Sequence, residues 1–172
     1  MNLDKLKHIT CFIFDVDGVL TDGSVLVLPD GLLARSMNIK DGYALQLAVK
    51  KGYRVVVISG SNSPEVKARL NKLGVNEVHM QVIDKAALLR SIMDQAQLPA
   101  SACLYMGDDI PDLKVMQLTG FPCCPSDAVP EIKAVSVYIA QQQGGAGCVR
   151  EVIEKVLKLR GDWNEDVLVP AQ

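Results

Sequence analysis

The residues with the clearest chemical potential in this 172-residue chain are two aspartates one residue apart, Asp15 and Asp17. They lie in CFIFDVDGVLTDG (residues 11 to 23), where an apolar run gives way to a glycine-rich polar segment. Taken alone, the pair fits a solvated turn after a buried strand as well as it fits nucleophilic or acid/base chemistry. The polar residues at the ends of the other apolar runs must therefore distinguish the solvated turn from a catalytic pair.

The next three apolar runs also end in polar residues: Ser59-Gly60 after residue 58, Asp84-Lys85 after residue 82, and Gly107-Asp108-Asp109, with Asp112 following, after residue 106. Because the carboxyl ends of parallel strands meet at one edge of a sheet, these groups are expected to lie together. Clustered carboxylates repel one another unless a cation lies among them, and hard oxygen ligands suit Mg²⁺. A lysine and a hydroxyl beside that ion would complement a phosphate.

Two carboxylates beside Mg²⁺ and a phosphate can divide a hydrolysis between them. One aspartate can attack phosphorus, as in aspartyl-phosphate chemistry. The other can protonate the departing alkoxide and afterwards activate water. A phosphoaspartate receiver or regulatory module would use a similar acidic cluster, metal and lysine without turnover. Asp17 argues against that alternative, because a receiver needs no second acid/base two residues past its phosphorylated aspartate.

The elements that must position these groups alternate along the chain. Strands are predicted at residues 9–14, 53–58, 77–82, 102–106, 121–124 and 137–140, and helices at 42–52, 63–74, 84–98, 109–120 and 147–159. Such alternation predicts an α/β fold with a doubly wound, Rossmann-type parallel sheet. The length favours a single domain over residues 1–172, with a flexible tail from about 160 to 172. In the helix from Asp84, that residue is predicted to cap and Ala96 to face the sheet.

One segment breaks the alternation. Residues 24–39, SVLVLPDGLLARSMNI, contain two strand-like runs around Pro29-Asp30-Gly31, which predicts an inserted β-hairpin. The remaining spacing leaves room for little else: one helix between the hairpin and Ser59, and one helix and one strand between Ser59 and Lys85. We therefore expect no cap domain.

Composition excludes some partners and locations. A formal net charge of -2 gives no basic field for nucleic acid or for an anionic membrane. The five cysteines show no zinc-binding spacing, so we expect reduced thiols in the core. No signal peptide or apolar run of about 18 residues is present, so the expected location is the cytoplasm.

Four segments, DVDGVLTDG, ISGS, DK and GDDIPD, occur in the order in which they characterise the haloacid dehalogenase-like phosphohydrolases, and the chain resembles that superfamily. The TDG after the first motif, the hairpin ending in NIKDG, and GGAGCVRE further resemble the 3-deoxy-D-manno-octulosonate 8-phosphate phosphatases and the related nonulosonate 9-phosphate phosphatases. The resemblance runs from about residue 8 to 158. It implies a Mg²⁺-dependent phosphomonoesterase of lipopolysaccharide biosynthesis that acts on a 2-keto-3-deoxy sugar acid phosphate, through a phosphoaspartate on Asp15.

The resemblance also implies roles for individual residues. Asp15 would be nucleophile and metal ligand, Asp17 acid/base with its main-chain carbonyl on Mg²⁺, and Asp108 the third protein ligand. Ser59 and Lys85 would hold the phosphoryl oxygens. Asp109 and Asp112 would orient metal-bound water or Lys85. Substrate contacts are expected from Asp17, Asn38, Lys40, Asp41, Gly42, Ser59, Gly60, Ser61, Arg69, Lys72 and Lys85, and Arg150 is expected near the entrance.

Two features leave the substrate open. Ser61 stands where sugar-acid phosphatases of this type often have arginine or glutamate, so a nonulosonate 9-phosphate or another small sugar phosphate remains an alternative. Arg69 and Lys72 share one helix face and could meet a substrate carboxylate. Glu65, four residues before Arg69, equally fits an ordinary helix-surface ion pair with it.

The hairpin bears on assembly, because its LVL and LLARSMNI runs would expose apolar strand surface on a monomer. The resembling family assembles as tetramers through this hairpin. We therefore expect a homotetramer in which a neighbouring subunit closes the active site.

Overall fold

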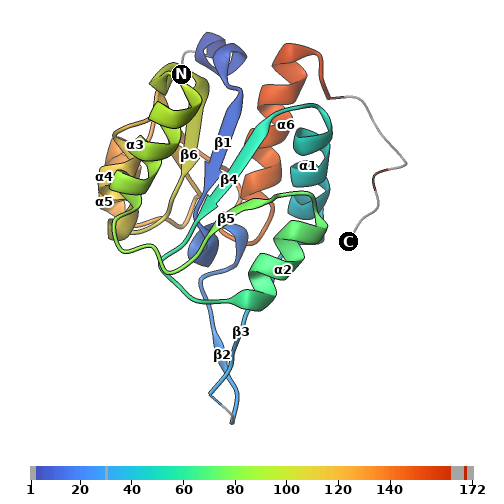
Figure 1. Cartoon of the computed structure of the whole chain (residues 1–172), viewed down its shortest axis with the longest axis vertical. Helices are drawn as coiled ribbons and strands as arrows, with labels where there is room; N and C mark the ends of the chain where they lie inside the picture. Colours follow the sequence, from blue (N-terminus) through green and yellow to red (C-terminus); the bar gives the residue numbers. More distant parts are fainter. Residues whose placement is uncertain (1–2, 30, 164–168, 170–172) are drawn as a thin grey trace.

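The computed structural model describes residues 3–29, 31–163 and 169 and contains a six-stranded sheet between two layers of helices (Figure 1). The strand order is β5-β4-β1-β6-β7-β8, and every neighbouring pair is parallel. The strands are β1 (Cys11–Phe14), β4 (Arg54–Ile58), β5 (Glu77–His79), β6 (Cys103–Met106), β7 (Phe121–Cys124) and β8 (Tyr138–Ile139). The predicted doubly wound parallel sheet is confirmed.

The central strands are buried on both faces, as their unbroken apolar sequences require. In β1, Phe12 and Phe14 join one core cluster, whereas Cys11 and Ile13 join the other. Each cluster is closed by its own layer of helices. The first layer holds α1 (Ile39–Lys50), α2 (Pro64–Lys72) and α6 (Cys148–Arg160), and the second holds α3 (Lys85–Ala96), α4 (Leu113–Met116) and α5 (Pro130–Val135).

Short helical segments complete the fold: η1 (Leu3–His8), η2 (Val16–Leu20), η3 (Ala100–Ala102) and η4 (Ile110–Asp112). All five cysteines are buried free thiols, as expected. Within the described ranges, none of the helices combines the length and hydropathy that crossing a bilayer requires.

Several predicted helix boundaries need correction. Helix α1 begins at Ile39, because the Asn38 side chain accepts a hydrogen bond from the Lys40 amide at 2.8 Å and caps the helix there. The helix predicted from residue 109 is only η4 followed by α4. Helix α5 was not predicted, since Pro130–Val135 is too short for a clear apolar period. Asp84 caps α3 as predicted, but Ala96 is exposed and Ala86 faces the core instead.

The inserted hairpin consists of β2 (Leu26–Val27) and β3 (Leu33–Ala34), paired antiparallel. It projects beyond the carboxyl-end edge of the sheet (Figure 1), and a bridge between Thr21 and Met37 closes its base. Its predicted range of 24–39 was too long, because residue 39 belongs to α1. Asp30 of the predicted turn lies outside the described residues.

No cap domain interrupts the described part of the chain. Between η2 and β4 it contains only the hairpin and α1, and between β4 and α3 only α2 and β5. The predicted flexible tail falls mostly outside the described residues. In its described part, Trp163 packs against Tyr43, with the ring centroids 6.2 Å apart.

Candidate active site

The candidate site lies where the order of the sheet reverses. From β1 the chain moves to β4 and β5 on one side, then returns to β6 on the other. Ligands of open α/β sheets bind outside the carboxyl ends of the strands at such a point. Here β1 leads into Asp15, β4 into Ser59 and β6 into Asp108, and Lys85 begins α3 beside them.

Asp15 is held in place at the end of β1. Its amide donates to the Met106 carbonyl at 3.1 Å, and its Oδ1 accepts from the Val16 amide at 2.7 Å. The same Oδ1 lies 2.9 Å from Lys85 Nζ. Since both side-chain contacts of Asp15 use Oδ1, Oδ2 is the oxygen left for a substrate or metal.

Lys85 also donates to Oδ1 of Asp112 at 2.8 Å, and the Tyr105 hydroxyl donates to that same oxygen at 2.7 Å. The second oxygen of Asp112 accepts from the Asp108 amide at 3.3 Å. Burial alone would lower the pKa of the Lys85 ammonium, but the carboxylates of Asp112 and Asp15 outweigh burial and raise it. Lys85 is therefore a fixed cation beside Asp15.

Tyr105 is a member of this network that the sequence did not reveal. It lies in the buried strand β6, where its ring reads as one more core aromatic. Burial and the nearby Asp112 carboxylate raise the pKa of Tyr105, which keeps its hydroxyl a donor.

The carboxylates of Asp15, Asp108 and Asp112 each bring an oxygen within 4.8 Å of the others. Burial and the Asp112 charge raise the pKa of Asp15 to about 8. Burial, together with Asp112 and Asp109, raises the pKa of Asp108 to about 7. Crowded, buried carboxylates of this kind are stabilised in their charged form by a hard cation, so the donor set fits Mg²⁺.

Gly18 shapes the same site. A Cβ at this position would lie 2.0 Å from Oδ2 of Asp108, and the residue has a φ of +80°. Only glycine combines that backbone conformation with that approach. The carboxylate of Asp108 therefore lies directly against the loop that follows Asp15.

Asp17 does not join the carboxylate cluster. Its side chain turns toward the hairpin, where Arg35 Nε lies 2.6 Å from Oδ1 and Nη2 lies 3.3 Å from Oδ2. That leaves the main-chain carbonyl as the group of Asp17 available to a metal. Arg35 was not predicted, because a single arginine just after a short strand carries no motif. Asp109 is exposed, and its side chain caps η4 by accepting from the Ile110 amide at 2.8 Å.

The loop after β4 presents two hydroxyls. Ser59 Oγ and Ser61 Oγ lie 2.9 Å apart, on either side of Gly60, and the Ser61 amide donates to Ser59 Oγ at 3.1 Å. Backbone hydrogen bonds from Gln81 and Val82 to this loop fix it against the segment after β5. The side chain of Ser61 therefore reaches back to Ser59.

Two of the predicted substrate-contacting residues at the start of α1, Asn38 and Asp41, also bond to α6 or to the segment before it. Asp41 is 2% exposed, and its Oδ1 accepts from the Arg150 amide at 2.7 Å, so it caps α6. Burial raises the pKa of Asp41 to about 6. Asn38 Nδ2 donates to the Gly145 carbonyl at 3.1 Å, and Gly42 is buried. Of this group, only Lys40 is exposed.

Arg150 was expected near the site entrance, but its side chain is engaged in packing. Its guanidinium lies 5.7 Å from the ring centroid of Tyr43 and 5.4 Å from that of Trp163. Nε also lies 3.1 Å from a carboxylate oxygen of Glu154. Arg150 therefore joins α6 to α1 and to the following segment.

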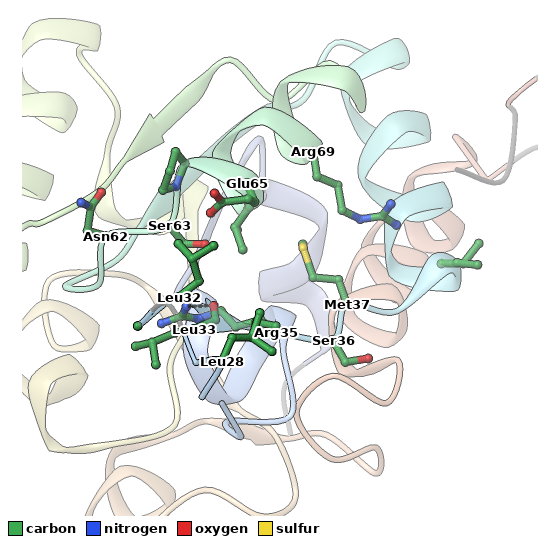
Figure 2. A pocket seen from close by; sticks show the side chains of 15 residues that line it. Leu28, Leu32, Leu33, Arg35, Ser36, Met37, Asn62, Ser63, Glu65 and Arg69 are labelled. Carbon is green, nitrogen blue, oxygen red and sulfur yellow. Dashed lines mark hydrogen bonds between the residues drawn. The ribbon is translucent and has the colours of Figure 1, made fainter. Parts of the chain in front are cut away.

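A groove of about 880 Å³ separates the hairpin from α2 (Figure 2). Leu32, Leu33 and Arg35 line its hairpin side, and Glu65 and Arg69 line its α2 side. Lys72, also on α2, is exposed and does not line the groove. Arg69 and Lys72 are thus not brought together at one opening.

Known relatives extend over nearly the whole chain. It is 31% identical over 157 residues to the 3-deoxy-D-manno-octulosonate 8-phosphate phosphatase of Haemophilus influenzae, covering 91% of this chain and 87% of that protein. It is 29% identical over 161 residues to the enzyme of the same name from Escherichia coli K12, covering 94% and 86%. No family model matches the chain.

Solved structures agree with the sequence relatives. The 3-deoxy-D-manno-octulosonate 8-phosphate phosphatase of Moraxella catarrhalis, in complex with magnesium, phosphate and KDO, has a TM-score of 0.90 and 34% identity, covering 94% of this chain and 92% of that chain. The cobalt-bound phosphatase of Haemophilus influenzae has a TM-score of 0.86 and 30% identity, covering 91% and 92%. The chain belongs to this family of haloacid dehalogenase-like phosphatases, the 3-deoxy-D-manno-octulosonate 8-phosphate phosphatases.

Proposed function

We propose that the chain is a Mg²⁺-dependent phosphomonoesterase that hydrolyses 3-deoxy-D-manno-octulosonate 8-phosphate through a phosphoaspartate on Asp15. The observation that carries this proposal is the contact of Lys85 with both Asp15 and Asp112, beside Asp108. The relative from Moraxella catarrhalis, which binds magnesium, phosphate and KDO, supports the choice of substrate.

In the first step, Oδ2 of Asp15 attacks phosphorus in line with the ester oxygen, and the phosphorus–oxygen ester bond breaks. Lys85 and the Ser59 hydroxyl bind the non-bridging oxygens of the phosphoryl group. Asp17 donates its proton to the departing alkoxide, which leaves as the free sugar acid. Mg²⁺, held by Asp15, Asp108 and the main-chain carbonyl of Asp17, would neutralise charge on carboxylate and phosphate.

In the second step, Asp17 accepts a proton from water as the water attacks the phosphoaspartate. Cleavage of the acyl phosphate releases inorganic phosphate and restores the Asp15 carboxylate. The Lys85 ammonium and the Tyr105 hydroxyl both donate to Oδ1 of Asp112. Asp112 and Tyr105 therefore keep Lys85 in position through both steps. A receiver module has no use for this second proton exchange, so Asp17 and the phosphatase relatives both disfavour that alternative.

A second candidate function is hydrolysis of a nonulosonate 9-phosphate or another small sugar phosphate by the same machinery. The observation that favours it is Ser61, whose short side chain bonds to Ser59 and cannot make a charged contact with the sugar. Phosphate release from octulosonate 8-phosphate, nonulosonate 9-phosphates and common sugar phosphates, with and without Mg²⁺, separates the two. A higher kcat/KM for a nonulosonate ester would overturn the first choice.

For assembly, we propose a homotetramer in which a neighbouring subunit covers the site. The exposed apolar side chains of Leu26 and Val27, 65% and 68% exposed, support a buried role for the hairpin in an assembly. The hairpin also projects from the edge of the sheet at which β1 ends (Figure 1), and Asp15 directly follows β1. Sedimentation of the wild type and of the double variant Leu26→Ser/Val27→Ser tests this proposal, because the variant should dissociate. A wild-type protein that is a stable, fully active monomer would contradict the proposal. The cytoplasmic location stays a prediction.

A further inference from the structure

The hairpin sends one side chain back into the candidate site. Arg35 follows β3, and its neighbours Ala34 and Ser36 are exposed, yet its own side chain is only 6% exposed. Nη1 donates to the Leu33 carbonyl at 3.1 Å, which fixes the guanidinium relative to the hairpin backbone. Arg35 also forms part of the hairpin side of the groove (Figure 2). It therefore touches both the groove and Asp17.

The contact with Asp17 is a two-point contact. A guanidinium that meets both oxygens of a carboxylate fixes the plane of that carboxylate as well as its distance, which a lysine cannot do. Among the described residues, Arg35 makes the only hydrogen bonds to the Asp17 carboxylate. Asp17 is 35% exposed and is followed by a glycine with positive φ, so its side chain has few other constraints.

We propose that Arg35 is a positioning residue that orients the Asp17 carboxylate for proton exchange with the leaving group. This inference rests on the proposed function, in which the phosphoryl group passes to Asp15 and a proton passes from Asp17 to the ester oxygen. Nε lies 2.6 Å from Oδ1, whereas Nη2 lies 3.3 Å from Oδ2. The strong contact therefore anchors Oδ1, and Oδ2 is the oxygen that exchanges the proton.

The experiment compares two leaving groups. The alkoxide of a sugar is a poor leaving group and needs a proton from Asp17, but p-nitrophenolate leaves readily without one. Single-turnover release of the leaving group, with enzyme in excess, is measured for 3-deoxy-D-manno-octulosonate 8-phosphate and for p-nitrophenyl phosphate. Arg35→Met should slow release of the sugar about 100-fold and release of p-nitrophenol less than about threefold. Arg35→Lys, which keeps the charge without the fork, should fall in between.

Two further variants make the result decisive. Arg54→Met removes another two-point ion pair, in which Arg54 contacts Glu77 at 2.8 and 2.6 Å. Arg54 begins β4, at the end of the strand away from the candidate site, so this variant should leave the ratio of the two rates unchanged. Asp17→Asn should show the same selective loss as Arg35→Met. Thermal unfolding and sedimentation check whether each variant keeps its fold and assembly. If Arg35→Met does not fold, Arg35→Lys supplies the comparison.

The outcomes separate the two claims. In one outcome, Asp17→Asn loses sugar release selectively, but both Arg35 variants keep the wild-type ratio of sugar release to p-nitrophenol release, or lose both rates equally. The positioning role of Arg35 is then wrong, and the proposed function stands. If Asp17→Asn itself shows no selective loss, the acid role of Asp17 fails and the inference about Arg35 fails with it.

Discussion

The Lys85 ammonium lies 2.9 Å from Oδ1 of Asp15, with both side chains nearly inaccessible to solvent. The two residues come from different parts of the chain, one at the end of β1 and one in the first turn of α3. A cation at a helix N-terminus is unfavourable unless it has partners, and here the carboxylates of Asp15 and Asp112 provide them. The lysine is therefore placed to hold a nucleophile and an incoming phosphate at the same time.

Replacing Lys85 tests this relationship. We expect Lys85→Met to lower kcat/KM by about 100- to 1000-fold, because a fixed charge on the phosphoryl oxygens is lost. The matched control is Lys114→Met on α4, an exposed lysine that should change kcat/KM less than twofold. Steady-state phosphate release measures both. A Lys85→Met enzyme within threefold of wild type would show that the contact is only structural.

Tyr105 should matter for both stability and turnover. Tyr105→Phe removes one of two donors to Oδ1 of Asp112, which should lower the free energy of unfolding by about 1 kcal/mol. Lys85 then loses part of its alignment, and kcat should fall about 10-fold. Urea unfolding and steady-state kinetics check the two effects. Loss of stability with an unchanged kcat would restrict Tyr105 to packing.

Gly18 can be compared with a glycine of the same backbone conformation. Both Gly18 and Gly52 have positive φ, +80° and +84°, but a Cβ at Gly52 would meet nothing within 4 Å. Each change to alanine should cost about 1 kcal/mol of stability from the backbone alone. Only Gly18→Ala should also weaken Mg²⁺ binding and activity, because its Cβ would displace Asp108. Isothermal titration with Mg²⁺ distinguishes them, and equal Mg²⁺ affinities would contradict the assignment.

The stability of the metal-free protein should depend on pH with a defined sign. Burial raises the pKa of Asp15 to about 8 and that of Asp108 to about 7, above the value of about 4 in an unfolded chain. Between these limits the folded state binds more protons, so the free energy of unfolding should fall as pH rises from about 4 to about 8. Mg²⁺ should reverse the loss at high pH, because it favours the ionised carboxylates.

Urea unfolding in a chelator, at pH 5 and pH 8.5, measures this dependence. Asp15→Asn should flatten it, since one titrating carboxylate is gone. A metal-free protein whose stability rises over the same interval would show that these carboxylates are not strained by burial.

The strands and the positions of Asp15, Ser59, Lys85 and Asp108 could be predicted, because each follows an apolar run whose carboxyl end must meet the others at one sheet edge. Arg35 and Tyr105 could not, since their partners Asp17 and Asp112 are reached only once the chain has folded. Tyr105 has the sequence pattern of a core residue, and its hydroxyl becomes informative only beside a buried carboxylate.

Asp41 illustrates the opposite difficulty. Its place after the hairpin, in NIKDG, implied a substrate contact, yet its carboxylate lies under the first turn of α6 and caps that helix. A capping aspartate and a substrate-binding aspartate have the same sequence appearance. Which role applies depends on where α6 packs, and α1 and α6 are far apart in sequence.

The central claim is that a phosphoaspartate forms on Asp15. An acid-quenched rapid-mixing experiment tests it most directly, with Mg²⁺ and with 3-deoxy-D-manno-octulosonate 8-phosphate whose phosphate group carries an isotopic label. We expect label on the protein within one turnover, located by mass spectrometry at Asp15, and none on Asp15→Asn or without Mg²⁺. Full hydrolysis by Asp15→Asn, or turnover in which no label ever reaches Asp15, would contradict the account.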